Sequence, residues 1–272
     1  MTNNNRVIVA EDDPYAREEI LNLLSRDWRT RVAAEFDSFS KKAFHDYLND
    51  PVNKTDAIIL DTEVPWDPNW PIEAFEVVAA LDEPPKLIFL CTVPVPRYWN
   101  DVLMEYDFFG GYLLKQEVLY SLATAVSLVV QGKIVITESI FRMPSAVHLK
   151  KGTLIIDGTR AIRDFTPREQ EILRHGILNN HSQRDIEDEL VISRNWISEV
   201  LSTVYDKLQL KEILSNEIAL SSIFSDKAVL EKAESILNEN GEKSEEINLR
   251  KAPWLTTLAF HLLTIPEVRS VR

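Results

Sequence analysis

The sequence has little cysteine, little glycine and no long hydrophobic run, and each shortage excludes a class of structure. Cys91 is the only cysteine, so no disulfide can form within the chain, which suits a reducing compartment. Seven glycines leave little material for a glycine-rich loop that cradles phosphates. The apolar stretch at 254–263 is far too short to span a bilayer. Because no secretory signal pattern is seen, we expect a cytoplasmic protein that does not associate with membranes.

Positive charge is also scarce. Lysine and arginine number 30 against 43 aspartate and glutamate residues, which gives a formal net charge of −13. Sequence-independent nucleic-acid binding depends on basic side chains that face phosphates, so this composition excludes a broadly basic binding surface. The composition does not exclude a local surface that binds DNA. The length of 272 residues suits two domains, and a hydrophobic fraction of 45% can supply their cores.

The first half of the chain alternates short apolar runs with helical patterns. The runs predict strands at 7–10, 31–36, 57–60, 87–90 and 111–114, and the spacing between them predicts helices at 14–27, 41–48, 72–81, 98–106 and 116–130. Near-continuous apolar runs are typical of strands that are buried on both faces. We therefore predict that residues 1–132 form an α/β doubly wound sheet of five parallel strands.

Charged residues follow three of the predicted strands. Glu11 and Asp12 follow the first strand, Asp61 the third and Lys115 the fifth. Ligands of doubly wound sheets bind beyond the carboxyl ends of the strands, and a strand order of 2-1-3-4-5 would bring the three carboxylates together there. Taken alone, Glu11-Asp12-Asp13 could instead stabilise the N-terminus of the helix that begins at Pro14.

Such a carboxylate cluster indicates a metal ion. Carboxylates that lie close together repel one another unless a cation neutralises them. Mg²⁺ prefers oxygen ligands and leaves room for a phosphate. An aspartate beside Mg²⁺ can act as a nucleophile, and a lysine can balance the charge of a transferring phosphoryl group. The pattern therefore predicts a Mg²⁺-dependent phosphoryl-acceptor site.

The same residues carry a resemblance to a known family. Receiver domains of response regulators are similar to residues 5–131 in three motifs, Val9-Ala10-Glu11-Asp12-Asp13-Pro14, Ile59-Leu60-Asp61 and Gly111-Tyr112-Leu113-Leu114-Lys115. The resemblance implies phosphorylation of Asp61 by a sensor histidine kinase and an aromatic switch at Tyr112. The metal ligands that it implies are the carboxylates of Glu11, Asp12 and Asp61 and the backbone carbonyl of Glu63.

One position of the family pattern can be aligned in two ways. Receiver domains carry a serine or threonine just after the fourth strand, and its hydroxyl contacts the phosphoryl group. Direct register puts Cys91 at that place, and a shift of one residue puts Thr92 there. We favour Thr92, because a thiol is a poor hydrogen-bond donor to phosphate. Phosphoryl transfer would then involve Asp61, Thr92 and Lys115, and the switch would include Thr92.

The second half of the chain has a helical pattern. We interpret residues 133–162 as a linker whose short β-like pieces could form a hairpin. Three helices then begin at hydroxyl residues that can cap backbone N–H groups, namely Thr166, Ser182 and Ser193. Short turns join these helices, which is typical of a helix-turn-helix domain whose recognition helix enters the major groove of DNA.

The opening of this region closely resembles LuxR-type helix-turn-helix domains, in Phe165-Thr166-Pro167-Arg168-Glu169-Gln170-Glu171-Ile172-Leu173. The resemblance covers residues 163–223, with one extra residue in the turn at 179–182. Together with the receiver domain, the architecture is similar to NarL-type regulators. It implies a homodimeric transcription regulator that binds promoter DNA and is not an enzyme. The DNA contacts that it implies are Arg194, Asn195, Ser198 and Ser202.

The predicted DNA-reading helix carries little positive charge. Arg194 is the only cation between residues 193 and 202, where Glu199 is an anion. Residues 162–215 contain seven lysines and arginines against ten acidic residues, a net charge of −3. Phosphate contacts usually use cations. The alternative is therefore an atypical receiver and helix-turn-helix protein that acts through protein–protein interaction, with weak or no DNA binding.

Residues 224–272 form the last predicted region, a helical C-terminal extension. Apolar residues recur at helical spacing within 226–240 and again within 253–263. Such segments can form a partner or dimer face, and they can equally pack back onto their own domain. The five histidines show no metal-ligand spacing, so the sequence predicts no zinc site.

Overall fold

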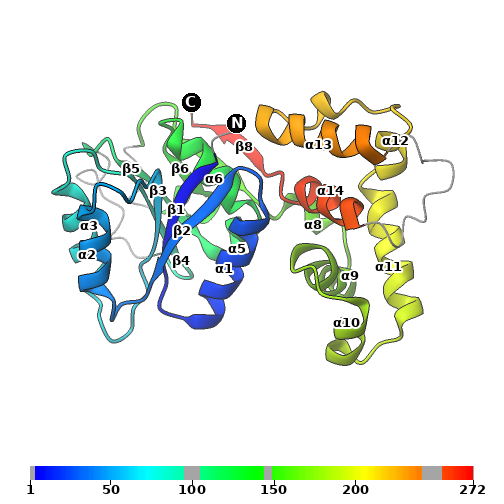
Figure 1. Cartoon of the computed structure of the whole chain (residues 1–272), viewed down its shortest axis with the longest axis horizontal. Coiled ribbons are helices and arrows are strands. Elements are labelled where there is room, and N and C mark those ends of the chain that lie inside the picture. Colours follow the sequence, from blue (N-terminus) through cyan, green and yellow to red (C-terminus); the bar gives the residue numbers. More distant parts are fainter. Residues whose placement is uncertain (1–3, 95–104, 144–148, 241–252, 272) are drawn as a thin grey trace. The chain divides into compact units, whose positions relative to one another are not determined.

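The computed structural model describes residues 4–94, 105–143, 149–240 and 253–271. The chain divides into two compact units (Figure 1). One comprises Asn3–Thr159 together with the C-terminal Pro266–Arg272, and the other comprises Arg160–Ile265. The helix predicted at 98–106 lies outside the described residues, apart from its last two positions. Within the described part of the chain, every helix is too short or too polar to cross a membrane.

The first unit is built on one sheet, as predicted (Figure 1). The strand order is β2-β1-β3-β4-β5-β6-β7-β8, which confirms the order 2-1-3-4-5 for the predicted strands. All neighbouring strands are parallel except β7 and β8. The strands are β1 (Asn5–Ala10), β2 (Thr30–Phe36), β3 (Ala57–Asp61), β4 (Lys86–Cys91), β5 (Phe109–Leu114), β6 (Val135–Thr137), β7 (Leu154–Asp157) and β8 (Glu267–Ser270).

Three strands were not predicted. β6 and β7 lie in the segment that we interpreted as a linker, and they pair in parallel, so they do not form a hairpin. Both are only three or four residues long, which is why their pattern resembled a linker. β5 leaves backbone N–H and C=O groups at its outer side, and β6 pairs with them. The part of the sheet formed by described residues therefore has eight strands, where the sequence predicted five.

Helices cover both faces of the sheet. On one face, α1 and α6 pack against Val7, Val9 and Ile59. On the other face, α2, α3 and α7 pack against Ile8, Ile58 and Leu60. The alternation of successive strand residues between the two clusters is the period of two that a buried strand requires. Among the described residues, the helical segments of this unit include α1 (Pro14–Arg26), α2 (Lys41–Asn49), α3 (Trp70–Ala79), α5 (Lys115–Val118), η2 (Leu119–Ser121), α6 (Leu122–Val130) and α7 (Glu138–Phe141).

The second unit is helical, and its predicted N-caps are present. Thr166 and Ser182 each form a capping box, with Glu169 and Asp185, and Ser193 accepts a hydrogen bond from the backbone N–H of Trp196. In the described part of this unit, the helical segments are α8 (Arg160–Arg163), α9 (Pro167–Leu173), the π-helical turn η4 (Arg174–Leu178), α10 (Gln183–Leu190), α11 (Arg194–Lys207), α12 (Leu210–Leu214), η5 (Leu220–Ser222), α13 (Lys227–Asn240) and α14 (Pro253–Leu263).

The C-terminal extension is helical only in part. α14 packs on α8, η4 and α13 of the same unit, and most of its apolar residues are buried. Figure 1 shows α14 beside α13 and α8. This favours the interpretation that the segment packs back onto its own domain. The chain then forms β8, which pairs antiparallel with β7. The prediction of a wholly helical extension is therefore wrong for residues 267–270, whose exposed side chains carry no helical pattern.

The turn between α10 and α11 contains a strained residue. Val191 adopts the left-handed conformation, with φ 54° and ψ 52°, and its side chain is 88% exposed. This conformation costs a residue with a Cβ roughly 1–2 kcal/mol, and glycine is the usual residue there.

We expect Val191→Gly to raise the free energy of unfolding by about 1 kcal/mol, because the relief of strain exceeds the entropy that glycine loses. Urea denaturation measures the change. Val191→Ala keeps the Cβ and is the matched control, which should change stability much less. A loss of stability in Val191→Gly would contradict the proposed strain.

Candidate functional site

Two carboxylates and one amine meet at the carboxyl ends of β1, β3 and β5. Nζ of Lys115 lies 2.7 Å from Oε2 of Glu11 and 3.3 Å from Oδ1 of Asp61. Glu11 and Asp61 are each only 2% exposed. Asp61 ends β3, Glu11 follows β1, and Lys115 follows β5. The structure thus brings together the side chains that the sequence placed at three separate strand ends.

Strand alternation explains why these side chains share one face of the sheet. One apolar cluster contains four residues near the strand ends, Val9, Ile59, Leu90 and Leu113. The residues two positions further along each strand point to the same side, and they are Glu11, Asp61, Thr92 and Lys115. Cys91 belongs to the cluster on the opposite face. This alternation favours Thr92 over Cys91 as the hydroxyl position.

The carboxylate cluster fits a hard divalent cation. Ligand oxygens of Glu11, Asp12 and Asp61 all lie within 4.8 Å of one another. Oε2 of Glu11 and Oδ1 of Asp61 are buried, and among the described residues only their ion pairs with Lys115 compensate them. A single amine cannot balance three carboxylates, so the donor set suits Mg²⁺. Asp13, the next residue, instead caps α1 by accepting hydrogen bonds from the backbone N–H groups of Tyr15 and Ala16.

The electrostatics reflect this crowding. Burial and the charge of Glu11 raise the pKa of Asp61 to about 8, although Lys115 acts in the opposite direction. Burial also raises the pKa of Glu11. Burial lowers the pKa of Lys115, but the charges of Asp61 and Glu11 outweigh this effect and raise it above its usual value. The lysine therefore stays charged, while the two carboxylates compete for its charge.

We expect Asp61→Asn to stabilise the protein above neutral pH when Mg²⁺ is removed. A carboxyl whose pKa is higher in the folded state binds its proton more tightly there, so the free energy of unfolding falls as the pH rises from about 4 to about 8. Asn removes this dependence, and the gain near pH 8 is on the order of a few kcal/mol. Urea denaturation in EDTA at pH 5 and 8 measures it. If the free energy of unfolding changes equally between pH 5 and pH 8 in the variant and the wild type, the prediction is contradicted.

The loops after β3 and β4 are joined through Glu63. Its carboxylate accepts hydrogen bonds from the backbone N–H groups of Thr92 at 2.5 Å and Val93 at 2.7 Å. The carbonyl of Thr92 accepts a hydrogen bond from Gln116, which follows Lys115. Thr92 itself is exposed at the end of β4. The side chain of Glu63 thus anchors the segment that carries Thr92, whereas the family resemblance assigned only its backbone carbonyl to the metal.

Cys91 and Tyr112 lie on the opposite face of the sheet from the carboxylates. Both are fully buried in the cluster that α3 covers, and the ring of Tyr112 meets that of Phe89 edge-on at 6.3 Å. Burial raises the pKa of the Cys91 thiol to about 12, so the thiol stays protonated and serves as a core residue. Tyr112 lies on β5, which leads to Lys115, and it pairs with Phe89 of β4.

The predicted DNA-reading residues lie along α11. Arg194 and Asn195 are exposed in its first turn, while Ser198 and Ser202 are half-buried. Nε of Arg194 lies 2.5 Å from Oε2 of Glu187 on α10. The one cation of this part of the helix is therefore already paired with a carboxylate.

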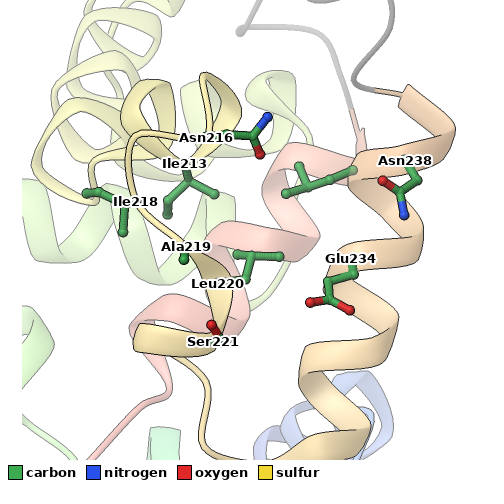
Figure 2. Close-up of a pocket in the computed structure, with 9 residues that line it drawn as sticks. Ile213, Asn216, Ile218, Ala219, Leu220, Ser221, Glu234 and Asn238 are labelled. Atoms are coloured by element: carbon green, nitrogen blue, oxygen red, sulfur yellow. The ribbon is translucent and has the colours of Figure 1, made fainter.

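Two features of the helical unit were not predicted. A pocket of about 300 Å³ lies between α13 and the segment from α12 to η5. Figure 2 shows the residues that line it, which are Ile213, Asn216, Ile218, Ala219, Leu220, Ser221, Glu234, Leu237 and Asn238. Glu234 is the one ionisable side chain of this lining, so the pocket offers no pair of groups for acid–base chemistry. The second feature is a cluster of His175, His181 and Glu189, although the sequence predicted no zinc site.

Comparisons with known proteins find similarity to response regulators. No protein-family profile matches the chain. It is 23% identical to the Fimbriae Z protein of Salmonella typhimurium over 208 residues, which are 76% of this chain and 92% of that protein. Solved structures to which the chain is similar include those of response regulators.

Two solved structures illustrate this similarity. RcsB from Salmonella enterica serovar Typhimurium, bound to promoter P1flhDC with the phosphomimetic BeF3−, is 23% identical, with a TM-score of 0.43 and coverage of 75% of this chain and 92% of that one. A LuxR-family regulator from Aurantimonas sp. SI85-9A1 is 20% identical, with a TM-score of 0.38 and coverage of 48% and 87%.

Proposed function

We propose that this protein is a transcription regulator of a two-component system, switched by phosphorylation of Asp61. The observation that carries this proposal is the amine of Lys115 within 3.3 Å of two buried carboxylates at one edge of a parallel sheet. Buried charges are retained in proteins mainly where function uses them, and perturbed pKa values cluster at functional sites. Packing of the apolar core does not by itself explain why two carboxylates and an amine are buried together.

The proposed reaction transfers a phosphoryl group from a phosphohistidine of a sensor kinase. A carboxylate oxygen of Asp61 attacks phosphorus, the P–N bond breaks, and the imidazole leaves with the bonding electron pair. Lys115 supplies positive charge to the phosphoryl oxygens, and the hydroxyl of Thr92 donates a hydrogen bond to one of them. A Mg²⁺ ion held by Glu11, Asp12, Asp61 and the carbonyl of Glu63 would neutralise the charge that develops on the phosphoryl group.

The switch that follows involves Thr92 and Tyr112. When the hydroxyl of Thr92 turns toward a phosphoryl group, the loop that Glu63 anchors shifts, and β4 passes this change to the buried ring of Tyr112. Such coupling lets the domain alternate between two packings that differ in their tendency to dimerise or to release the DNA-reading helix. Sedimentation with and without phosphorylation tests the proposed homodimer.

Intact mass measurement tests the acceptor. The protein is incubated with acetyl phosphate and Mg²⁺ and then weighed, and we expect the added mass of one phosphoryl group. Asp61→Asn should lack it, whereas Asp67→Asn, which removes a carboxylate of the same loop, should keep it. Wild type without added mass, or added mass that persists in Asp61→Asn, would refute the proposal.

The ion pair of Arg194 with Glu187 favours a second candidate function. A paired cation contributes less to phosphate binding, so the helical unit could serve protein–protein interaction with weak or no DNA binding. Binding to fragments of host DNA at low and high salt separates the two candidates. For a DNA-binding protein we expect salt-dependent binding, weakened by Arg194→Ala with a salt slope smaller by about one. Absence of binding at low salt would support the interaction protein.

A further inference from the structure

Two histidines and a glutamate converge in the helical unit, away from the carboxylates of the sheet. Nδ1 of His175 lies 3.2 Å from Nδ1 of His181 and 3.2 Å from Oε2 of Glu189. Nδ1 of His181 lies 3.9 Å from the same carboxylate oxygen. The three ligand atoms thus form a compact triangle. The side chain of His175 is only 14% exposed, so the triangle is partly enclosed.

The backbone fixes this convergence. His175 lies in the π-helical turn η4, where the N–H of Asn179 donates to the carbonyl of Arg174. A π-turn accommodates one residue more than an α-helix of the same length. The N–H of His181 then donates to the carbonyl of His175 at 2.8 Å, and Asn180 between them adopts φ 57°. The π-turn and the left-handed Asn180 together bring the two imidazoles close to each other.

The third ligand comes from a regular helix. Glu189 lies near the end of α10, whose first turn is secured by the capping box of Ser182 and Asp185 directly after His181. All three ligands are thus held by hydrogen-bonded backbone, two by the π-turn and its continuation and one by α10. Sites built on such rigid elements keep their geometry before the ligand binds.

The spacing matches a tetrahedral metal ion. Ligand atoms at about 2.0–2.2 Å from an ion lie about 3.3–3.6 Å apart in a tetrahedron, close to the observed 3.2, 3.2 and 3.9 Å. Without an ion, a hydrogen bond between the two Nδ1 atoms requires that one of them carries a proton and the other accepts it. That one proton is then shared between the accepting Nδ1 and the carboxylate of Glu189. An ion between the three satisfies all of them.

We propose that His175, His181 and Glu189 bind one divalent transition-metal ion, with Zn²⁺ as the best match. Two imidazoles and one carboxylate suit Zn²⁺ and disfavour Mg²⁺, which prefers oxygen ligands. Three protein ligands leave a fourth position for water or another ligand. The ion links η4 to α10, the helix that precedes α11, and so gives the helical unit an input that is independent of Asp61.

Co²⁺ titration of the full chain tests the site, because four-coordinate Co²⁺ absorbs strongly in the visible range. Excess Mg²⁺ is present throughout to occupy the carboxylate cluster of the sheet. We expect one equivalent of Co²⁺ to develop the bands, Zn²⁺ to displace it, and Zn²⁺ to raise the melting temperature. His181→Ala and Glu189→Gln, both at exposed positions, should lower the affinity at least about tenfold.

His45→Ala is the matched control, because it removes an exposed histidine of the other unit and should bind like the wild type. Circular dichroism confirms that each variant is folded. Absence of the Co²⁺ bands in the wild type, or full binding by both site variants, would overturn the proposal. The Co²⁺ titration and the melting measurement depend neither on phosphorylation nor on DNA. A failure of the proposed metal site is therefore distinguishable from a failure of the proposed regulator function.

Discussion

Lys115→Met is expected to lower the free energy of unfolding by about 3–5 kcal/mol near pH 8 without Mg²⁺, the usual cost of breaking a buried ion pair by removing one partner. The amine of Lys115 contacts Glu11 at 2.7 Å and Asp61 at 3.3 Å, and both carboxylates are 2% exposed. Methionine has a similar length but no charge, so the two buried carboxyl groups lose their compensating cation, and Asp61 must either take up a proton or stay ionised beside Glu11, both at a cost in stability. Urea denaturation in EDTA measures the loss.

The origin of this loss can be checked in two ways. Lowering the pH should restore stability, because protonation of Asp61 and Glu11, whose pKa values are raised in the folded protein, removes the repulsion. The double variant Lys115→Met with Asp61→Asn should recover most of the lost stability, since it leaves a single buried carboxylate. If Lys115→Met is as stable as the wild type at pH 8, the amine does not balance the carboxylates and the proposed site loses its basis.

Gly111→Ala is expected to cost about 3 kcal/mol or more, because it forces β5 and β6 apart. Gly111 pairs with Val135, and a Cβ built on it would lie 1.9 Å from the carbonyl oxygen of Val135. Its φ of +157° is also unfavourable for a residue with a side chain. Overpacking costs about 1–3 kcal/mol where the surroundings can yield, and a backbone in a sheet yields less than a side chain.

Gly132→Ala is the control for this prediction. Gly132 has φ +84°, but no atom lies within 4 Å of its added Cβ, so only the strained backbone should cost about 1–2 kcal/mol. Denaturation compares the two variants, and limited proteolysis shows whether residues 133–159 become accessible in Gly111→Ala. Equal costs for the two substitutions would mean that β6 does not depend on close pairing with β5.

Much of the first unit follows from local patterns. Short β-branched apolar runs such as Ala57–Leu60, bounded by polar residues, indicate buried strands, and their alternation with helices favours parallel pairing with crossovers. Once the order 2-1-3-4-5 is assumed, the acidic residues after β1 and β3 must meet. The capping residues Thr166, Ser182 and Ser193 mark helix starts in the same way, because a cap is satisfied by residues two or three positions away.

The tertiary structure decided what depends on distant partners. β6, β7 and β8 are strands because the edge of β5 and then each other's edges offer unpaired backbone groups, and no local pattern of three or four residues shows this. Only the register of β4 shows on which face of the sheet Thr92 lies, since a shift of one residue exchanges the two faces.

The histidine cluster was beyond any spacing rule for the same reason. Five residues lie between His175 and His181, a spacing that neither a regular helix nor a strand turns into contact. The π-turn and the left-handed Asn180 bring the two side chains together. Sequence alone therefore determined the elements whose stability is local and the motifs at strand ends. Folding determined the sites formed by irregular backbone, because that backbone is stabilised by the whole unit around it.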